Sequence, residues 1–377
     1  MGYLPKVGGR VNRRLGEGLR WRGSDGLVTS MSQDEESVYE KELGGKLLAS
    51  VSRSFYLTLK ALPKALREPI SLAYLLARTA DTIADTVEVP EALRMECLRA
   101  FDGVIRVPDR EVEVRLAERL AKAFAAYQTD AAEKRLMEVV GESLAWLGTM
   151  RGEARAAVLE VLERIIAGQI LDIERFPGDG RLRSLKTAEE LDDYTWRVAG
   201  CVGEFWTRLC ASELEAAFEE GVSVDEMVVD GIGMGKALQL INILRDVGKD
   251  MKLGRCYLPE EEWIEVGIES AEQIRAESGK LKPVWERWTR ECDGHLEAGL
   301  RYVCRLRDAK LRYATALPLM LAFGTLRKLR AASWEEVLGG VKISRLDVAR
   351  LLTETLVTSR SASGVMAQAG RWGRVVG

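Results

Sequence analysis

Apolar residues recur every three or four positions over most of this chain, and this spacing is the feature that most limits its possible folds. Such spacing places apolar side chains on one face of an α-helix, whereas a half-buried strand alternates with a period of two. Long period-two stretches are absent, and no repeat of about 20 to 50 residues indicates a solenoid. The sequence therefore predicts an all-α single domain. The clearest helices are expected over 36–62, 91–107, 111–127, 131–150, 155–175, 188–209, 223–251 and 283–306.

The composition supports a large core and makes several kinds of site poor interpretations. Of the 377 residues, 47% are hydrophobic and the formal net charge is -3, so no general attraction to nucleic acid is expected. The six cysteines show no C-x-x-C spacing and are interpreted as reduced, mostly buried thiols. His295 is the only histidine, which argues against histidine-based triads and His-ligated zinc.

The two ends differ from the middle of the chain. Residues 1–30 are rich in glycine and arginine and lack the apolar region of a secretory signal, so we expect a disordered basic extension there. The helical domain is expected over 31–345, beginning near Met31, and 346–377 as a C-terminal tail without a transmembrane helix. No run reaches the roughly 18 to 20 apolar residues that span a bilayer. We therefore expect a cytoplasmic protein with at most peripheral membrane association.

Two carboxylates stand one helical turn apart in the stretch SLAYLLARTADTIADT, which runs from Ser71 to Thr86. Steps of four, three and four residues put the polar side chains of this stretch on one helical stripe: Tyr74, Arg78, Asp81 and Asp85. Carboxylates one turn apart repel each other unless cations offset them. The stripe therefore indicates a site for something positively charged.

The same arrangement recurs in LQLINILRDVGKDMKLGRCYLP. Steps of three, four and four again define one polar stripe: Gln239, Asn242, Asp246 and Asp250. The neighbouring basic residues are Arg245, Lys249, Lys252 and Arg255. Mg²⁺ prefers carboxylates, water and phosphate oxygens, so two such helices facing each other suit the binding of a diphosphate. A solvated helix face would explain one such pair alone, but two pairs in apolar helices favour the functional interpretation.

A third segment, DDYTWRVAGCVGEFWTRL, carries glycines in mid-helix. Its expected inner face consists of Tyr194, Val198, Cys201 and Phe205. Glycine in a helix costs about 1 kcal/mol relative to alanine. Gly200 and Gly203 therefore indicate either close helix packing or room for a ligand.

Four ordered segments resemble the squalene/phytoene synthase family, most closely its squalene synthases, and the similarity spans about residues 45–330. The segments are SRSFYLTL, YLLARTADTIAD, YTWRVAGCVGEFW and QLINILRDVGKD. The resemblance implies an isoprenoid-synthase-type helical bundle with a central pocket between the two aspartate-bearing helices. It also implies that two molecules of farnesyl diphosphate join head to head to presqualene diphosphate, which NADPH then reduces to squalene.

The resemblance further implies a role for each matching residue. The groups expected to bind Mg²⁺ and diphosphate are Asp81, Asp85, Asp246 and Asp250. The first substrate site would be lined by Ser52, Arg53, Phe55, Tyr74 and Arg78. Tyr194 would accept a proton in the first half-reaction, Arg78 and Arg245 would lie near the diphosphates, and Gln239 and Asn242 would complete the polar wall. Arg255 and Lys252 would contact the phosphorylated cofactor, and Asp172 matches a family helix more loosely.

One segment departs from the pattern. In ATALPLMLAFGTL, Leu319 stands where the eukaryotic squalene synthases of the family carry a polar amide, and Ala314 stands where they carry an aromatic residue. This difference argues against the reductive step. The alternatives are non-reductive synthases that form phytoene, dehydrosqualene or hydroxysqualene, a terpene cyclase, or a non-catalytic helical binding protein. GIGMG, from Gly231 to Gly235, follows no strand and is not interpreted as a dinucleotide fingerprint.

Overall fold

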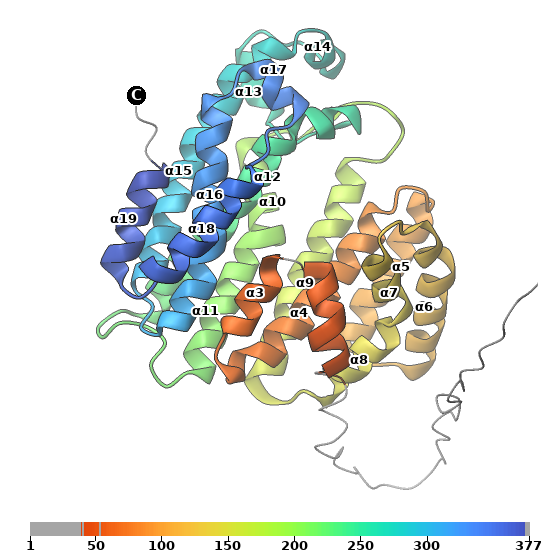
Figure 1. Cartoon of the computed structure of the whole chain (residues 1–377). Helices are drawn as coiled ribbons and strands as arrows, with labels where there is room; N and C mark the ends of the chain where they lie inside the picture. The colour runs from red at the N-terminus through yellow and green to blue at the C-terminus, as the bar shows by residue number, and fades with distance from the viewer. Residues whose placement is uncertain (1–38, 40, 53, 374–377) are drawn as a thin grey trace, which may run out of the picture.

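The computed structural model describes residues 39, 41–52 and 54–373 and is a bundle of helices (Figure 1). The N-terminal half consists of α2 (Leu48–Ser52), α3 (Ser54–Ala61), α4 (Lys64–Asp85), α5 (Glu91–Arg106), α6 (Arg110–Ala123), α7 (Ala131–Glu138), α8 (Val140–Thr149) and α9 (Gly152–Arg175). The C-terminal half consists of α10 (Ala188–Thr195), α11 (Cys201–Glu213), α12 (Val224–Lys252), α13 (Glu260–Glu265), α14 (Ala271–Ala276), α15 (Lys282–Cys304), α16 (Ala309–Ala331), α17 (Trp334–Gly339), α18 (Arg345–Thr358) and α19 (Ala362–Gly373). The all-α prediction is confirmed.

Short elements complete the described chain. They are the π-helical turns η1 (Glu42–Leu47) and η3 (Trp196–Gly200), the 3-10 turns η2 (Ala125–Tyr127) and η4 (Ser278–Leu281), and the strands β1 (Arg183–Ser184) and β2 (Arg255–Cys256). The two strands pair in parallel, with Arg183 opposite Arg255. The predicted extension over residues 1–30 lies outside the described residues, so its disorder stays a prediction.

Helix α12 is the central element of the bundle. It begins at a capping box, in which the Ser223 side chain accepts from the Glu226 backbone and the Glu226 carboxylate accepts from the Ser223 backbone. Helices α11, α15, α16 and α17 pack around it, and α9 packs between α4 and α11. Among the described residues, α12 is the one helix long and apolar enough to cross a membrane, but 67% of its most apolar window is buried in the protein.

Close contact of α12 with α11 and with the preceding η3 depends on glycine. A Cβ atom at Gly203 would lie 1.9 Å from the carbonyl oxygen of Gly231, and one at Gly235 would lie 2.2 Å from that of Ala199. The helices can therefore approach so closely only because these positions lack side chains. GIGMG lies in the middle of α12 and is a packing segment.

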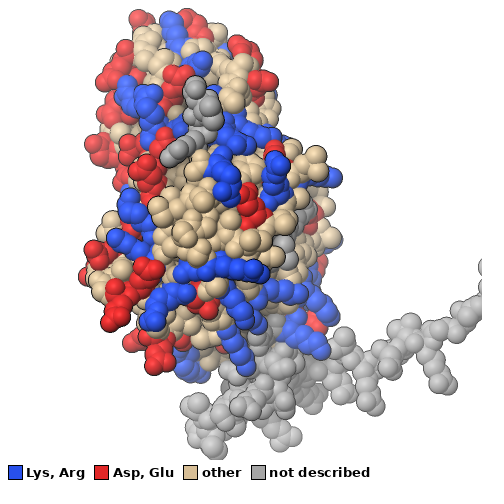
Figure 2. Space-filling view, turned by 60° about the vertical axis from the view of Figure 1, so that its left-hand side comes forward, with Lys and Arg blue, Asp and Glu red and all other residues tan. Residues whose placement is uncertain are grey.

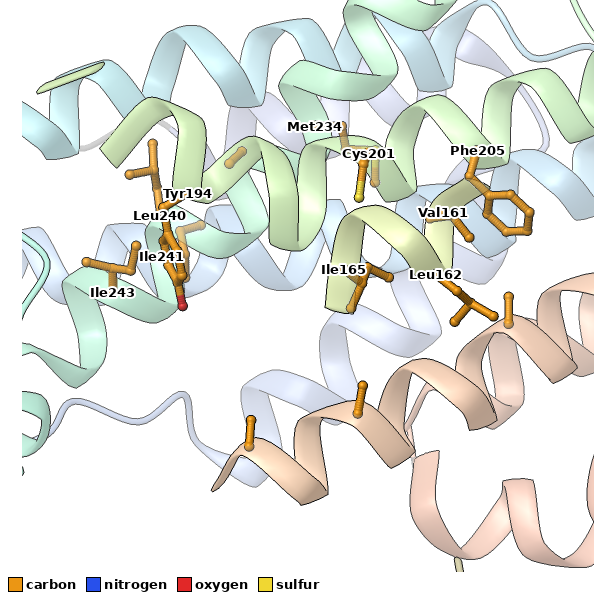
Figure 3. Packing of buried hydrophobic residues seen from close by; sticks show 14 of the residues in the cluster. Val161, Leu162, Ile165, Tyr194, Cys201, Phe205, Met234, Leu240, Ile241 and Ile243 are labelled. Carbon is orange, nitrogen blue, oxygen red and sulfur yellow. The ribbon is translucent and has the colours of Figure 1, made fainter. Parts of the chain in front are cut away.

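The chain expected to form one helix over 188–209 is interrupted by η3. A π-helical turn inserts one residue into the α-helical repeat, so the side chains after it point in directions different from those of an uninterrupted α-helix. Tyr194 and Val198 line a cavity, and Tyr194 also belongs to the hydrophobic core together with Cys201 and Phe205. Figure 3 shows these two residues of α11 beside Val161, Leu162 and Ile165 of α9.

The segment expected as a C-terminal tail is helical in the structure. Helices α18 and α19 pack against each other and against α16, and α19 also contacts α15. Leu351, Val365 and Trp372 from these two helices belong to the main hydrophobic core. Residues 346–373 therefore form part of the helical body, on its left side in Figure 1.

Candidate active site

The two aspartate stripes line a single cavity of about 480 Å³. Asp81 and Asp85 come from the last turns of α4, and Asp246 and Asp250 come from the last turns of α12. The predicted residues that also line it are Tyr194, Gln239, Asn242 and Arg255. The prediction that both stripes face one central site is therefore supported by the geometry.

Each stripe has an arginine beside its first aspartate. Arg245 forms two hydrogen bonds with the Asp246 carboxylate, of 2.9 Å from Nε and 2.7 Å from Nη2. Arg78 lies 3.9 Å from Asp81 and also pairs with Glu133. Neither arginine lines the cavity, so both act on it through the carboxylates that they hold.

The cavity carries an excess of negative charge. Burial raises the pKa of Asp81 to about 7, against the opposing effect of Arg78, and Asp85 adds to the rise. Burial likewise raises the pKa of Asp250 to about 7, assisted by Asp246. A raised carboxyl pKa means that the charged form lacks sufficient compensation. The site therefore favours an added cation.

The carboxylates do not form a ready-made metal cage. No group of three or more His, Cys, Asp or Glu side chains in the described part of the chain lies close enough to hold one ion. Mg²⁺, however, is usually bound through one or two carboxylates together with water and substrate phosphates. The two separated aspartate pairs, in a cavity that Gln239 and Asn242 also line, fit that mode of binding.

Two residues that the sequence did not single out lie at the centre of the site. Gln169 of α9 donates a hydrogen bond of 2.6 Å to Asp81. Tyr257 lies after β2 and donates one of 2.9 Å to Asp172, which also lies 3.3 Å from Arg255. Asp172 and Lys249 line the cavity as well.

A left-handed turn brings Arg255 and Tyr257 back to the site. Gly254 follows α12 with φ +83, a conformation that residues with a Cβ rarely adopt. A Cβ there would also lie 2.8 Å from the carbonyl oxygen of Arg181. The turn places β2 beside β1 and aims the side chains after it at the end of the aspartate helix.

Other predicted residues lie away from this cavity. Ser52 is buried and donates to the Leu48 carbonyl in its own helix, at 2.5 Å. Tyr74 is half-buried in α4, one turn before Arg78, and Lys252 is exposed; neither lines the cavity. Arg53 lies outside the described residues, as does the side chain of Phe55.

An apolar pocket of about 200 Å³ adjoins the polar cavity, and Val198 lines both. Its walls come from η3, α11, α12, α15 and α16, and include Trp206, Tyr302 and Pro318. Gly203, Gly231 and Gly235 line it too. These glycines therefore allow close helix packing and also leave space for the pocket. Ala314 lines this pocket, whereas Leu319 is fully buried and does not line it.

An all-α bundle with two facing aspartate helices and an adjoining apolar pocket defines the class of isoprenoid synthases. Residues 48–347 match the squalene/phytoene synthase family, and the chain belongs to that family. The prediction made from the four sequence segments is confirmed.

Individual relatives are distant. The chain is 26% identical to "Squalene synthase LSS" of Botryococcus braunii over 82% of this chain and 62% of that protein. It is also 26% identical to the presqualene diphosphate synthase of Zymomonas mobilis, over 82% of this chain and 90% of that one. The complex of TcSQS with the ligand BPH1237 has the same fold, with a TM-score of 0.70 at 20% identity over 90% of each chain. The chain spans less than two thirds of the length of the squalene synthases it matches first.

Proposed function

We propose that this protein joins two molecules of farnesyl diphosphate head to head to form presqualene diphosphate. The observation that carries the proposal is the shared cavity: both aspartate pairs and Tyr194 line it, and it adjoins an apolar pocket at Val198. Diphosphate would bind at the polar end, and a prenyl chain would lie in the apolar pocket. Relatives named for squalene and presqualene diphosphate synthesis support this choice of substrate.

The four aspartates would hold Mg²⁺ together with the diphosphate. Bound Mg²⁺ supplies Lewis-acid neutralisation of the leaving group. Lys249 and Arg255 add positive charge at the same end of the cavity, and Arg78 and Arg245 orient the first aspartate of each pair. The apolar walls exclude water from the allylic cation that forms when diphosphate leaves.

The predicted reduction by NADPH has less support from the residues. Of the cationic pair expected to contact the cofactor, Arg255 lines the cavity but pairs with Asp172, and Lys252 is exposed outside the cavity lining. These residues do not form a recognisable NADPH site. Reduction to squalene stays a prediction, and a non-reductive synthase is the second candidate. The match over 90% of a presqualene diphosphate synthase favours that candidate.

Product analysis separates the two candidates. The purified protein is incubated with farnesyl diphosphate and Mg²⁺, with and without NADPH, and the products are identified by mass spectrometry. Squalene that forms only with NADPH supports the reductive assignment. A product spectrum that saturating NADPH leaves unchanged supports the non-reductive one.

We propose further that the protein associates peripherally with anionic membranes through the outward face of α18. Leu346 is 84% exposed on this face, and Leu356 and Val357 are 57% and 58% exposed. The exposed charged residues of the helix and its end are all basic: Arg345, Arg350 and Arg360. The two carboxylates of α18 pair instead with residues of neighbouring helices, Asp347 with Lys328 and Glu354 with Arg371.

This combination suits a lipid surface. Exposed apolar side chains among arginines are typical of helices that lie in the interface of anionic membranes. Figure 2, turned so that the side with α18 and α19 comes forward, shows uncharged surface with many Lys and Arg and fewer Asp and Glu around it. A product that carries two farnesyl chains would also partition readily from the apolar pocket into a bilayer.

A further inference from the structure

A chain of hydrogen bonds leads from Tyr194 into the wall of the cavity. The Tyr194 hydroxyl donates to the Tyr257 hydroxyl at 3.4 Å, and Tyr257 donates to Asp172 at 2.9 Å. The other oxygen of Asp172 lies 3.3 Å from Arg255. Tyr194, Tyr257 and Asp172 are each less than a tenth exposed. The chain therefore begins at the cavity and ends at a buried carboxylate.

Aromatic packing holds the two tyrosines in place. Their rings stack with centroids 4.8 Å apart and planes at 25°. Phe176 meets the Tyr257 ring edge-on at 5.0 Å. The Gly254 turn and the pairing of β1 with β2 fix the backbone that carries Tyr257. Both hydroxyls are therefore positioned before any substrate arrives, as efficient proton transfer requires.

Tyr194 cannot act as a base by ionising first. Burial raises its pKa well above the usual value, and Tyr257 and Asp172 raise it further. A neutral phenol accepts a proton only if its own proton leaves at the same time. Asp172 is a suitable destination, because burial raises its pKa against the opposing effects of Arg255 and Tyr257.

We infer that Tyr257 is a positioning and relay residue, through which the proton that Tyr194 takes from the substrate passes to Asp172. The inference rests on the proposed function. As the cyclopropane ring of presqualene diphosphate closes, a C–H bond at C1 of one farnesyl group breaks and its electron pair forms the new C–C bond. The proton goes to the Tyr194 oxygen, the Tyr194 proton goes to Tyr257, and the Tyr257 proton goes to Asp172. No other reactant is needed.

The test compares Tyr257→Phe, Tyr194→Phe and the double variant, with Tyr313→Phe as a matched control that removes the hydroxyl of a half-buried tyrosine outside both pockets. Tyr257→Phe is expected to lower the rate of presqualene diphosphate formation by about 10²-fold, within the range of general base catalysis. KM should change little, and pyrophosphate release should continue, so farnesol should rise relative to the coupled product. Deuterium at C1 of the substrate should slow the variant more than the wild type.

The double variant distinguishes a relay from a structural role. Two residues of one relay act as a unit, so the double variant should be no slower than Tyr194→Phe alone. Losses that multiply, or a Tyr257→Phe rate close to wild type, would overturn the inference. If Tyr257→Phe lowers the melting temperature, Asp172→Asn serves as the second variant and should give the same shift toward farnesol; an unchanged product ratio in it would also overturn the inference. A wild-type protein that forms no presqualene diphosphate would instead contradict the proposed function.

Discussion

At the scale of single residues, the two aspartates of each pair have different surroundings. Asp246 is held by Arg245 and Asp81 by Arg78 and Gln169. Asp85 and Asp250 form no ion pair with any described residue. The second aspartate of each pair is thus the one left open to a bound cation, and the first is oriented by its arginine.

In protein freed of divalent ions, Asp81→Asn tests whether the excess negative charge of the cavity lowers the free energy of unfolding. The folded-state pKa of Asp81, about 7, lies above the ordinary value of 3.8, so the folded state binds the proton more tightly. This stabilisation is fully present below about pH 4 and is lost as the pH rises through about 7. At about pH 8 the variant should therefore be more stable than wild type by about 1 to 2 kcal/mol, a value reduced for the 34% exposure of the side chain.

Urea unfolding at several pH values measures the difference. The gap between variant and wild type should close toward about pH 4, where both side chains are neutral. Turnover of the variant should be abolished in Mg²⁺, although its fold is intact. A variant less stable than wild type at every pH would show that Asp81 has a structural ion-pair role instead.

Sequence reasoning found the aspartates because they repeat at helical spacing, a local signal. Tyr257 carried no such signal, since it lies 63 residues from Tyr194 and reaches it only through the turn at Gly254. Gln169 was missed for the same reason, because its partner Asp81 is 88 residues away. The sequence predicts Lys252 as a site residue, but Lys249 lines the cavity and Lys252 does not.

At the scale of helices, the contact between α11 and α12 forms both the core and the apolar pocket. Gly203→Ala should destabilise the protein by about 3 kcal/mol, because its Cβ would collide with the Gly231 carbonyl oxygen. Gly294→Ala in α15 is the matched control, since nothing lies within 4 Å of a Cβ there. That variant should gain about 0.5 to 1 kcal/mol from helix propensity. Thermal unfolding checks both, and equal effects of the two substitutions would contradict the packing account.

The apolar spacing predicted most of the helices, but it did not predict where a helix is interrupted. Apolar periodicity predicted one helix over 188–209, whereas η3 inserts a π-helical turn at Trp196–Gly200. Propensity gives no sign of such a turn, because it depends on how α10 and α11 pack against α9 and α12. Of the predicted inner face, Tyr194 and Val198 line the cavity, and Tyr194, Cys201 and Phe205 belong to the core.

At the scale of the whole molecule, the C-terminal helices cover one side of the bundle and present the face proposed for membrane contact. Their helices were not among those expected from the sequence, although Val365, Ala369 and Trp372 stand at helical spacing and are buried in the structure. Sedimentation with vesicles of mixed phosphatidylglycerol and phosphatidylcholine measures how strongly the protein binds to an anionic membrane. The pair Leu346→Glu and Val357→Glu should lower binding at least tenfold, because it replaces apolar contacts with charges that anionic lipid repels.

The control pair, Val107→Glu and Val229→Glu, makes the same charge change at exposed valines elsewhere and should leave vesicle binding nearly unchanged. Equal losses for both pairs would indicate general charge repulsion rather than a specific face. Binding that is as strong to pure phosphatidylcholine would contradict the role of the arginines. Concentration-dependent dimerisation abolished by the first pair would identify a second copy as the partner.

The size of the product made from farnesyl diphosphate tests the central claim most directly. The proposed function, which rests on two facing aspartate pairs and one adjoining apolar pocket, requires that two substrates are joined. With Mg²⁺ and farnesyl diphosphate alone, the purified protein should release pyrophosphate and form presqualene diphosphate, and Asp250→Asn should do neither. Products that contain only one farnesyl unit, or no pyrophosphate release by the wild type, would contradict the account.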